Sequence, residues 1–386
     1  MKNSPLRSVL PVLFGFFVMG FCDVVGIATS YVKADFGWSE TLSGFVPSMV
    51  FIWFFILSVP VALWMNRLGR KTMVHISNIV TLIGMLLPFI SYNVVTCLLA
   101  FVLLGIGNTI LQVALNPLLT NVVKGDALTS SLTTGQVVKA VSSFLGPIIA
   151  GFAATVLGKW QYLFPIFAVI TLLSEIWLRL TPIPREEAAP AQGAGLPATL
   201  ALLGKPSVLL LFLGIFFVVG VDVGTNTVAP KLLLERCGYS LASAGLGSSV
   251  YFICRTVGAL LGAVLLVKMK DSTYFKVNIL AAIVALVALF FAKGAAGILV
   301  GVGAIGFFCS SIFPVIYSAA MKGHPSKENE LSGLMIMGVS GGAVIPPLMG
   351  LMTDWLGNQA GSLLIIGCCM AYLLFCALWM DKKVVE

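Results

Sequence analysis

The stretch FVMGFCDVVGIATSYVK, residues 17–33, places the carboxylate of Asp23 inside a long apolar run, and FVVGVDVGTNTVAPK, residues 217–231, does the same with Asp222. Two further pairs of segments follow in the same order: residues 105–125 resemble residues 301–323 around Pro117 and Pro314, and residues 142–158 resemble residues 342–357 around Pro147 and Pro347. Three matches in one order predict that the chain consists of two similarly folded halves.

The composition of the chain identifies the medium in which these halves fold. Of its 386 residues, 59% are hydrophobic and 10% are charged, whereas soluble domains carry about 25% charged residues. This excludes a water-soluble protein, because the chain cannot cover itself with a hydrated surface. A transmembrane helix needs roughly 20 apolar residues, and in lipid its backbone polar groups must be satisfied within the segment. We therefore predict an all-α integral membrane protein with twelve spans, at residues 9–32, 43–65, 74–92, 95–120, 128–157, 161–180, 207–231, 241–267, 277–292, 297–321, 331–353 and 360–380.

The longest polar break falls between the sixth and seventh predicted spans. Residues 179–205 are rich in Pro, Ala and Gly, which is typical of a linker. We predict an N-terminal six-helix half at residues 1–180, a cytoplasmic linker at residues 181–206 and a C-terminal six-helix half at residues 207–386. Two repeats of this kind, with a site between them near the membrane midplane, are the architecture of transporters that rock between two states.

The basic residues predict the orientation of the spans. With the N-terminus inside, the inner loops hold most of the 23 Lys and Arg residues, so the positive-inside rule places both termini in the cytoplasm. We expect the protein in a bacterial inner (plasma) membrane. The net charge of +8 does not indicate nucleic-acid binding, because the basic residues lie in short loops and form no basic stripe.

The sequence does not indicate an enzyme. Its only histidines are His75 and His324, it contains no CxxC pair, and most of its cysteines lie in apolar spans, where cysteine behaves as a small hydrophobic residue. No Walker lysine accompanies the glycine-rich segments, so ATP-driven transport is not indicated either. We expect no metal and no cofactor, and the ion that drives the protein is then H+ or Na+.

Ionisable residues inside the predicted spans are the main functional candidates. A charge at the bilayer centre costs roughly 2.5–3.5 kcal/mol even on a lenient scale, so such residues usually face a cavity and act there. We predict that Asp23 binds the coupling cation. Asp222 is the second candidate, because it is offset from Asp23 by one residue relative to the preceding glycines. The alternative is that an aspartate only pairs with a basic neighbour such as Lys139 and holds the bundle together.

A set of polar residues in the spans predicts where a solute is held. Asn108, Gln112 and Asn116 recur at intervals of four and therefore share one helical face. Sugars require paired donors and acceptors at fixed positions, which such amides provide. The predicted solute-binding residues are Asn108, Gln112, Asn116, Gln136, Lys139 and Asn226. Each amide taken alone has an alternative role as a hydrogen bond between helices.

Other charged residues are expected to hold helices together or to act as gates. These structural or gating charges are Arg255 and three residues of NRLGRKT, residues 66–72, namely Arg67, Arg70 and Lys71. The last three are expected to stay at the cytoplasmic face and bridge helix ends. Glu175 lies one turn before Arg179, and a local ion pair is expected there.

The loop NRLGRKT resembles the D-R-x-G-R-K signature of the major facilitator superfamily, with Asn66 in place of the Asp. A narrower resemblance, to the fucose–proton symporter family of sugar transporters, rests on the following segments: ALNP (114–117), FICRTVGA (252–259) and the Gly-Gly then Pro pattern of residues 338–357. These motifs and the two aspartates are spread over most of the chain. The resemblance implies the major facilitator fold, with twelve helices in two pseudo-symmetric halves. It also implies cation-coupled uptake of a sugar through a cavity lined by spans 1, 4, 5, 7, 10 and 11.

Two residues depart from the pattern of the narrower family. Gln112 stands where that family can carry a carboxylate, and Lys139 stands where it tends to have a neutral amide. Two kinds of substrate therefore remain open. The first is a sugar or sugar-like solute, taken up by alternating access with H+ or Na+. The second is an acidic sugar or other organic anion, whose carboxylate Lys139 and Arg255 would bind.

Other functions are less well supported by the sequence. A drug exporter is a third transport function, and a non-transporting membrane sensor is the alternative outside transport. As partners we expect the small-molecule solute and membrane lipid, no nucleic acid, and a monomeric protein.

Overall fold

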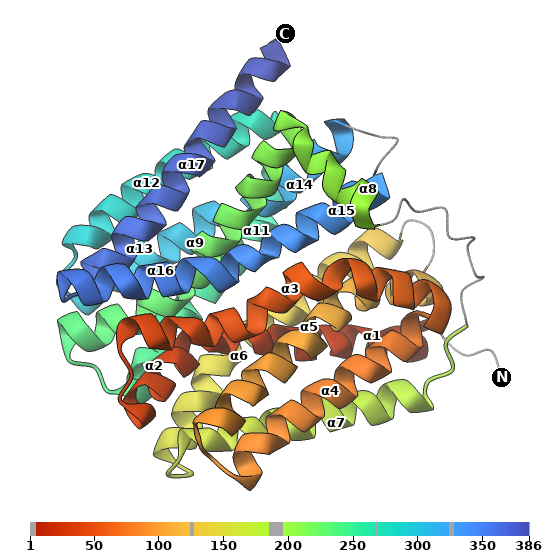
Figure 1. The fold of residues 1–386 in the computed structure, drawn as a ribbon, viewed down its shortest axis with the longest axis horizontal. Helices are drawn as coiled ribbons and strands as arrows, with labels where there is room; N and C mark the ends of the chain where they lie inside the picture. Colours follow the sequence, from red (N-terminus) through yellow and green to blue (C-terminus); the bar gives the residue numbers. More distant parts are fainter. Residues whose placement is uncertain (1–4, 124–126, 185–195, 267–268, 324–327, 386) are drawn as a thin grey trace. The chain divides into compact units, whose positions relative to one another are not determined.

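The computed structural model describes residues 5–123, 127–184, 196–266, 269–323 and 328–385, and every regular element in these ranges is helical (Figure 1). Among the described residues, twelve segments are long and apolar enough to cross a membrane, and each overlaps one predicted span. The predicted all-α chain with twelve apolar spans is therefore confirmed. Part of the predicted linker, residues 185–195, lies outside the described residues.

The chain divides into two compact units. The first unit comprises Met1–Val24 and Ile52–Gln192, and the second comprises Val25–Phe51 and Gly193–Glu386. Residues 25–51, which precede the predicted linker, thus group with the second unit. The division into six-helix halves at residues 181–206 stays a prediction.

The helices of the first unit are α1 (Pro5–Met19), the 3₁₀ turn η1 (Gly20–Val24), α4 (Arg70–Ile90), α5 (Val94–Val122), α6 (Ala127–Thr155), η2 (Trp160–Tyr162) and α7 (Leu163–Leu180). Helix α3 (Glu40–Leu68) begins in the second unit and ends in the first. The remaining helices of the second unit are α2 (Val25–Phe36), α8 (Leu196–Ala201), η3 (Leu202–Gly204), α9 (Pro206–Cys237), α10 (Leu241–Ala244), α11 (Leu246–Leu266), α12 (Asp271–Phe291), α13 (Ala295–Cys309), α14 (Ile312–Gly323), α15 (Glu328–Met337), η5 (Gly338–Ser340), α16 (Gly341–Leu356) and α17 (Ala360–Val385).

In the first unit, local sequence signals set the helix ends. Gly69, with a φ of 90°, is the single residue between α3 and α4, and this left-handed region of backbone space favours glycine. Asn93 caps α5: its side chain accepts hydrogen bonds from the amides of Val95 and Thr96, and the Thr96 hydroxyl accepts one from the Asn93 amide. This reciprocal capping box satisfies amides that the first turn leaves open. Helix α4 packs against α5 and α7, and α1 packs against α5, α6 and α7.

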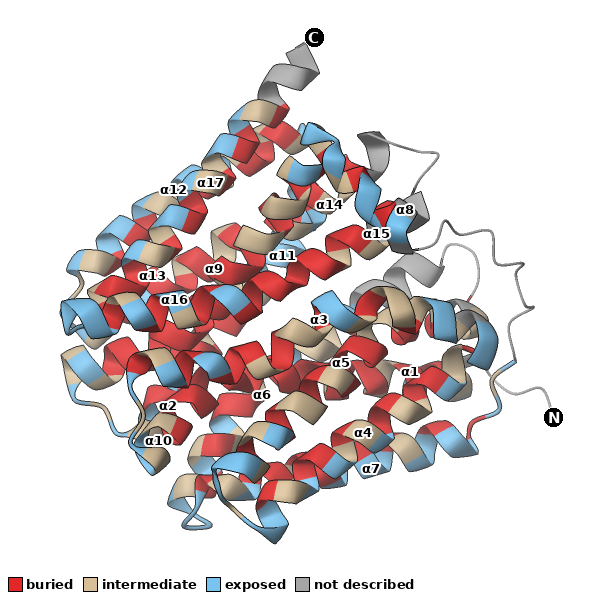
Figure 2. Ribbon diagram, viewed as in Figure 1, coloured by how far each residue is buried: buried red, intermediate tan, exposed pale blue. Residues whose placement is uncertain are grey.

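The second unit is organised around α9, its longest helix. Proline at the first turn begins α9, and Gly238, in the left-handed conformation, ends it by donating to the carbonyls of the last turn. Both residues are the expected signals for the start and end of a helix. Helix α9 contacts α2, α11, α13, α14, α16 and α17, which explains why most of its side chains are buried (Figure 2).

The exposed face of α12 is apolar. Its exposed residues fall at helical spacing: Val277, Leu280, Val284, Val287 and Phe291. Figure 2 shows exposed positions recurring along this helix. A soluble protein rarely exposes a contiguous apolar stripe of this kind, whereas lipid is a suitable partner for it.

Several predicted spans are interrupted rather than continuous, among them the first, the eighth at Gly245, the tenth and the eleventh. The first predicted span, residues 9–32, contains the 3₁₀ turn η1 between α1 and α2. The tenth breaks between α13 and α14, and the eleventh contains η5 between α15 and α16. Irregular backbone at membrane depth is tolerated where protein buries it, and every residue of η1 is buried. Hydropathy does not predict such breaks, because it averages over the whole span.

Candidate functional site

Asp23 lies in η1, where the first span is interrupted, and only 9% of it is exposed. Its Oδ2 accepts a hydrogen bond of 2.6 Å from the Ser143 hydroxyl on α6, and the Cys22 thiol donates to its Oδ1. The Ser143 hydroxyl also lies 3.0 Å from the backbone carbonyl of Lys139. A hydroxyl carries one proton, so Ser143 can donate to only one of these two oxygens at a time. The sequence did not single out Ser143, although it stands one helical turn after Lys139.

Two of the predicted solute-binding amides bind protein groups beside the same interruption. Asn108 is buried and donates from its Nδ2 to the carbonyl of Met19, the last residue of α1, at 2.7 Å. Gln112 in turn donates from its Nε2 to the Asn108 Oδ1 at 2.8 Å. The pair satisfies a carbonyl that the end of α1 leaves open. One turn further along α5, the buried Oδ1 of Asn116 has no hydrogen-bond partner among the described residues.

The two candidates on α6 differ from each other. Gln136 is exposed and Lys139 is half-buried. The backbone of α6 passes directly beside η1, since a Cβ added to Gly20 would lie 2.7 Å from the Lys139 carbonyl oxygen. Among the ion pairs of the described residues, however, none involves Lys139. The alternative that Asp23 only pairs with a basic neighbour stays a prediction.

In the second unit, Asp222 on α9 is paired with Arg255 on α11. Arg255 Nη2 lies 3.0 Å from Asp222 Oδ2, and the Tyr251 hydroxyl donates to Asp222 Oδ1. Beside them is a cavity of about 30 Å³ bordered by Cys309 and Phe313, which is room for about one water molecule. The sequence does not predict that Asp222 and Arg255 pair, because they lie on two different helices and residue spacing relates only residues of the same helix.

The Asp222–Arg255 ion pair leads to a direct expectation for Arg255→Leu. The variant leaves the carboxylate of Asp222 without its cation, so we expect a lower melting temperature and about a tenfold slower solute exchange, as for loss of a partly buried charge pair. Adding Asp222→Asn is expected to restore the melting temperature. If Arg255→Leu alone melts and exchanges like the wild type, this ion pair has no structural role.

The sixth candidate, Asn226, lies where α2 crosses α9. It is buried, and a Cβ added to Gly26 of α2 would lie only 2.1 Å from its Oδ1. The Ser248 hydroxyl donates to its backbone carbonyl at 3.1 Å. Gly26 is therefore required for the close approach of these two helices.

The basic loop residues bind the ends of neighbouring helices. Arg70 donates to the Pro117 carbonyl at 2.9 Å and to the Asn121 Oδ1 at 2.7 Å, both in the last two turns of α5. Lys71 donates to the Thr181 carbonyl, at the end of α7, at 2.7 Å. Arg67 is exposed. Cationic side chains at helix C-termini are favoured by the helix dipole.

Glu175 does not pair with Arg179, so that prediction is wrong. Its carboxylate lies 2.8 Å from the His75 Nδ1 and accepts a hydrogen bond of 3.2 Å from the Asn78 amide, both on α4. Helix α4 packs against α7 and brings these partly or fully buried groups to Glu175, whereas Arg179 is exposed. Spacing within one helix could not reveal partners on another.

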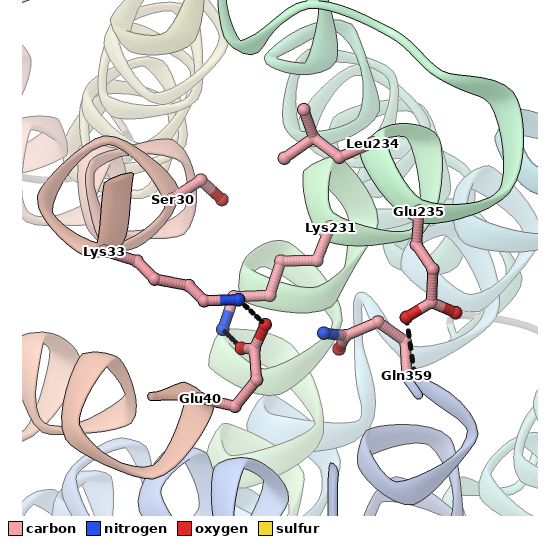
Figure 3. Close-up of a pocket in the computed structure, with 7 residues that line it drawn as sticks. All are labelled: Ser30, Lys33, Glu40, Lys231, Leu234, Glu235 and Gln359. Carbon is pink, nitrogen blue, oxygen red and sulfur yellow. Dashed lines mark hydrogen bonds and ion pairs between the residues drawn. The ribbon is translucent and has the colours of Figure 1, made fainter. Parts of the chain in front are cut away.

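An ionic cluster in the second unit is the largest feature that the sequence missed. Glu40, at the start of α3, accepts from Lys33 Nζ through its Oε1 and from Lys231 Nζ through its Oε2, at 2.5 Å each (Figure 3). Only 8% of the Lys231 side chain and 10% of the Glu40 side chain are exposed. The backbone amides of Glu40 and Thr41 also donate to the carboxylate of Asp354 on α16. The sequence places Lys33 and Lys231 at span ends and does not connect them.

Comparisons with known proteins agree with this architecture. The chain is 29% identical over 393 residues to a glucose/galactose transporter of Brucella abortus biovar 1 (strain 9-941), and the match covers 95% of this chain and 92% of the relative. Among solved structures, the D-xylose-proton symporter has a TM-score of 0.79 at 15% identity, covering 98% of this chain and 97% of that chain. The E. coli fucose:proton symporter FucP has a TM-score of 0.69 at 18% identity, covering 98% and 99%. At these identities the two structures show a shared fold.

The model of a protein family matches most of the chain. It is the model of the Major Facilitator Superfamily, and it covers residues 12–345, including the interrupted first span, the basic loop and the Asp222–Arg255 ion pair. The chain belongs to the Major Facilitator Superfamily.

Proposed function

We propose that this chain is a secondary active transporter that takes up a sugar by alternating access, coupled to H+ or Na+. The observation that carries the proposal is Asp23, a buried carboxylate at a break in a membrane-spanning helix. Discontinuous helices of this kind form substrate and ion sites in transporters. The glucose/galactose transporter and the two sugar–proton symporters described above support a sugar as the solute.

Asp23 is the coupling residue in this proposal, and Asp222 is held in an ion pair by Arg255. Asp23 has a hydroxyl partner, which suits both the ionised and the protonated carboxyl. Asp222 instead has a guanidinium partner, Arg255 Nη2, at 3.0 Å. We therefore assign proton or sodium binding to Asp23 and a structural or gating role to the Asp222–Arg255 ion pair.

The proposed orientation has both termini in the cytoplasm. The end of α2 and the start of α3, within residues 25–51, and the end of α9, residues 231–237, then face outward. In the second unit these outer ends are tightly packed. A Cβ added to Gly44 of α3 would lie 2.6 Å from the Pro346 carbonyl oxygen, and one added to Gly350 would lie 2.3 Å from that of Glu40. Small residues permit this close approach of helices in a membrane. We propose that these contacts form in the state closed to the outside and separate when it opens.

A second candidate function is uptake of an acidic sugar. It is favoured by Lys139, a half-buried cation without an ion-pair partner among the described residues. For an anionic substrate, Lys139→Gln is expected to raise the KM at least tenfold, because hydrogen bonds to a charged partner contribute about 1.5–3 kcal/mol. For a neutral sugar the same variant is expected to have a smaller effect on the KM, because glutamine keeps a hydrogen-bond donor and no charged partner on the sugar is lost.

A ligand screen on the purified protein tests which candidate applies. A ligand that binds the folded state raises the melting temperature. D-galactose, D-glucose, L-fucose and D-xylose are compared with D-galacturonate and D-glucuronate, each with and without Na+. We expect the neutral sugars to stabilise the wild type. Stabilisation by the uronates alone, lost in Lys139→Gln, would favour the acidic substrate, and a response to none of the six would contradict the sugar transporter.

A further inference from the structure

A cavity of about 360 Å³ lies entirely within the second unit, beside the ionic cluster (Figure 3). It is bordered by the last turns of α2 and α9, the start of α3 and the turn before α17. Its lining residues are Ser30, Lys33, Glu40, Lys231, Leu234, Glu235 and Gln359. None of them belongs to the solute-binding set predicted above. Its volume is at the lower end of the range of about 300–1,000 Å³ for small-molecule sites, which suits a single sugar ring.

The charges that border the cavity are balanced. Two ammonium groups, on Lys33 and Lys231, face two carboxylates, on Glu40 and Glu235. Glu40 already binds both ammonium groups. A charged guest would leave one charge uncompensated in a partly desolvated site, which is unfavourable. The cavity therefore suits a neutral guest.

Several polar groups of the lining have unused hydrogen-bonding capacity. Ser30 is 4% exposed, and its hydroxyl has no partner among the described residues; Figure 3 shows it pointing into the cavity. The Gln359 Oε1 accepts from Ser362. Its amide nitrogen is turned toward Lys231 and Glu40 in Figure 3, and the hydrogen bonds that Gln359 makes with described residues do not use this nitrogen. One carboxylate oxygen of Glu235 accepts from the Gln359 backbone amide, and the other accepts from none of the described residues.

We propose that this cavity is a second sugar site, which binds one neutral monosaccharide through Ser30, Gln359 and Glu235. A monosaccharide offers several hydroxyl groups, each both donor and acceptor, and so matches a lining that has spare donors and acceptors but no net charge. The choice of a sugar rather than another neutral polyol rests on the proposed function. In the proposed orientation the site lies at the outer ends of these helices of the second unit.

Substitutions at Ser30 test the site by direct binding. The full-length protein in detergent is titrated with radiolabelled D-galactose, D-glucose, L-fucose and D-xylose, and the stoichiometry is measured. We expect two sugars per wild-type chain for at least one of them. Ser30→Leu places an apolar side chain in the cavity and is expected to remove one of the two bound sugars. Ser30→Ala is expected to weaken binding of that sugar about two- to tenfold, the effect of one hydrogen bond. Ser48→Ala, a change in α3 outside the cavity lining, is the matched control.

Charged derivatives of galactose test whether the cavity binds only neutral guests. D-galacturonate and D-galactosamine are expected to compete at the Ser30-dependent site at least tenfold more weakly than D-galactose. Equal competition by either derivative would overturn the neutral-guest assignment. Unchanged binding of every sugar in Ser30→Leu, with a melting temperature like that of the wild type, would overturn the site. If Ser30→Leu does not fold, unchanged binding in Ser30→Ala and Gln359→Leu together has the same meaning.

The site and the proposed function fail in different ways. Absence of sugar uptake by the wild-type protein in proteoliposomes would reject the transporter, whatever the stoichiometry. Sugar uptake together with only one bound sugar per chain, whose affinity does not change in the Ser30 and Gln359 variants, would reject the second site alone.

Discussion

Asp23→Asn is expected to abolish accumulation of sugar against a gradient while leaving sugar exchange across the membrane largely intact. Asparagine keeps the size of the side chain and can still accept a hydrogen bond from the Ser143 hydroxyl, which lies 2.6 Å from the carboxylate in the wild type. It cannot take up a proton or carry the charge that binds a cation. We expect gradient-driven accumulation in proteoliposomes to fall at least tenfold, with counterflow exchange at half or more of the wild-type rate.

Ser143→Ala provides the comparison for this prediction. In our account the Ser143 hydroxyl donates to ionised Asp23, and it turns to the Lys139 carbonyl, 3.0 Å away, when Asp23 is protonated. Ser143 is thus a positioning residue that connects the state of the carboxyl to α6. Its loss is expected to shift the pH dependence of uptake without abolishing accumulation. Undiminished accumulation in Asp23→Asn would remove Asp23 from the coupling mechanism.

Glu40→Gln is expected to have the largest effect on stability. The variant leaves Lys231, with 8% of its side chain exposed, and Lys33 without their shared carboxylate. Removing one partner of a buried ion pair costs about 3–5 kcal/mol. We expect a clearly lower melting temperature and faster modification of Lys231 by an amine-reactive reagent, measured by mass spectrometry, because residues 25–51 separate more often from α9.

The double variant Glu40→Gln with Lys231→Met distinguishes a charge effect from a packing effect. It removes the buried cation together with its partner, and apolar replacement of a whole buried pair is often neutral. We expect it to recover most of the lost melting temperature. Glu235→Gln is the matched control, since no ammonium pairs with Glu235 among the described residues. A double variant as unstable as Glu40→Gln alone would contradict the ionic cluster.

The sequence predicts the twelve helices because their cause is local. Each span is a run of apolar residues long enough to cross a bilayer, and lipid forces such a run to be helical. The break at Gly20–Val24 was not predicted, because it depends on groups from other helices: Asn108 satisfies the Met19 carbonyl, and α6 packs against Gly20. The residues of the first span alone do not predict those contacts.

The sequence predicts which residues belong to the candidate site, but it does not predict which residues they interact with. A carboxylate in lipid marks Asp23 as functional whatever surrounds it. The partners of Asp222, Glu175 and Glu40 each come from a different helix, so spacing along one helix could not identify them. Glu40 was overlooked because it stands at the start of a span, where a charge is ordinary.

Gradient-driven transport of a sugar by the purified wild-type protein tests the central claim most directly. Proteoliposomes are loaded at neutral pH, diluted into acidic or Na+-containing buffer, and given radiolabelled D-galactose, D-glucose, L-fucose or D-xylose. Our account predicts accumulation of at least one of these sugars above its external concentration, dissipated by a protonophore or by loss of the Na+ gradient. Equilibration without accumulation under both gradients would contradict a secondary active transporter, and absence of any sugar flux would contradict sugar transport.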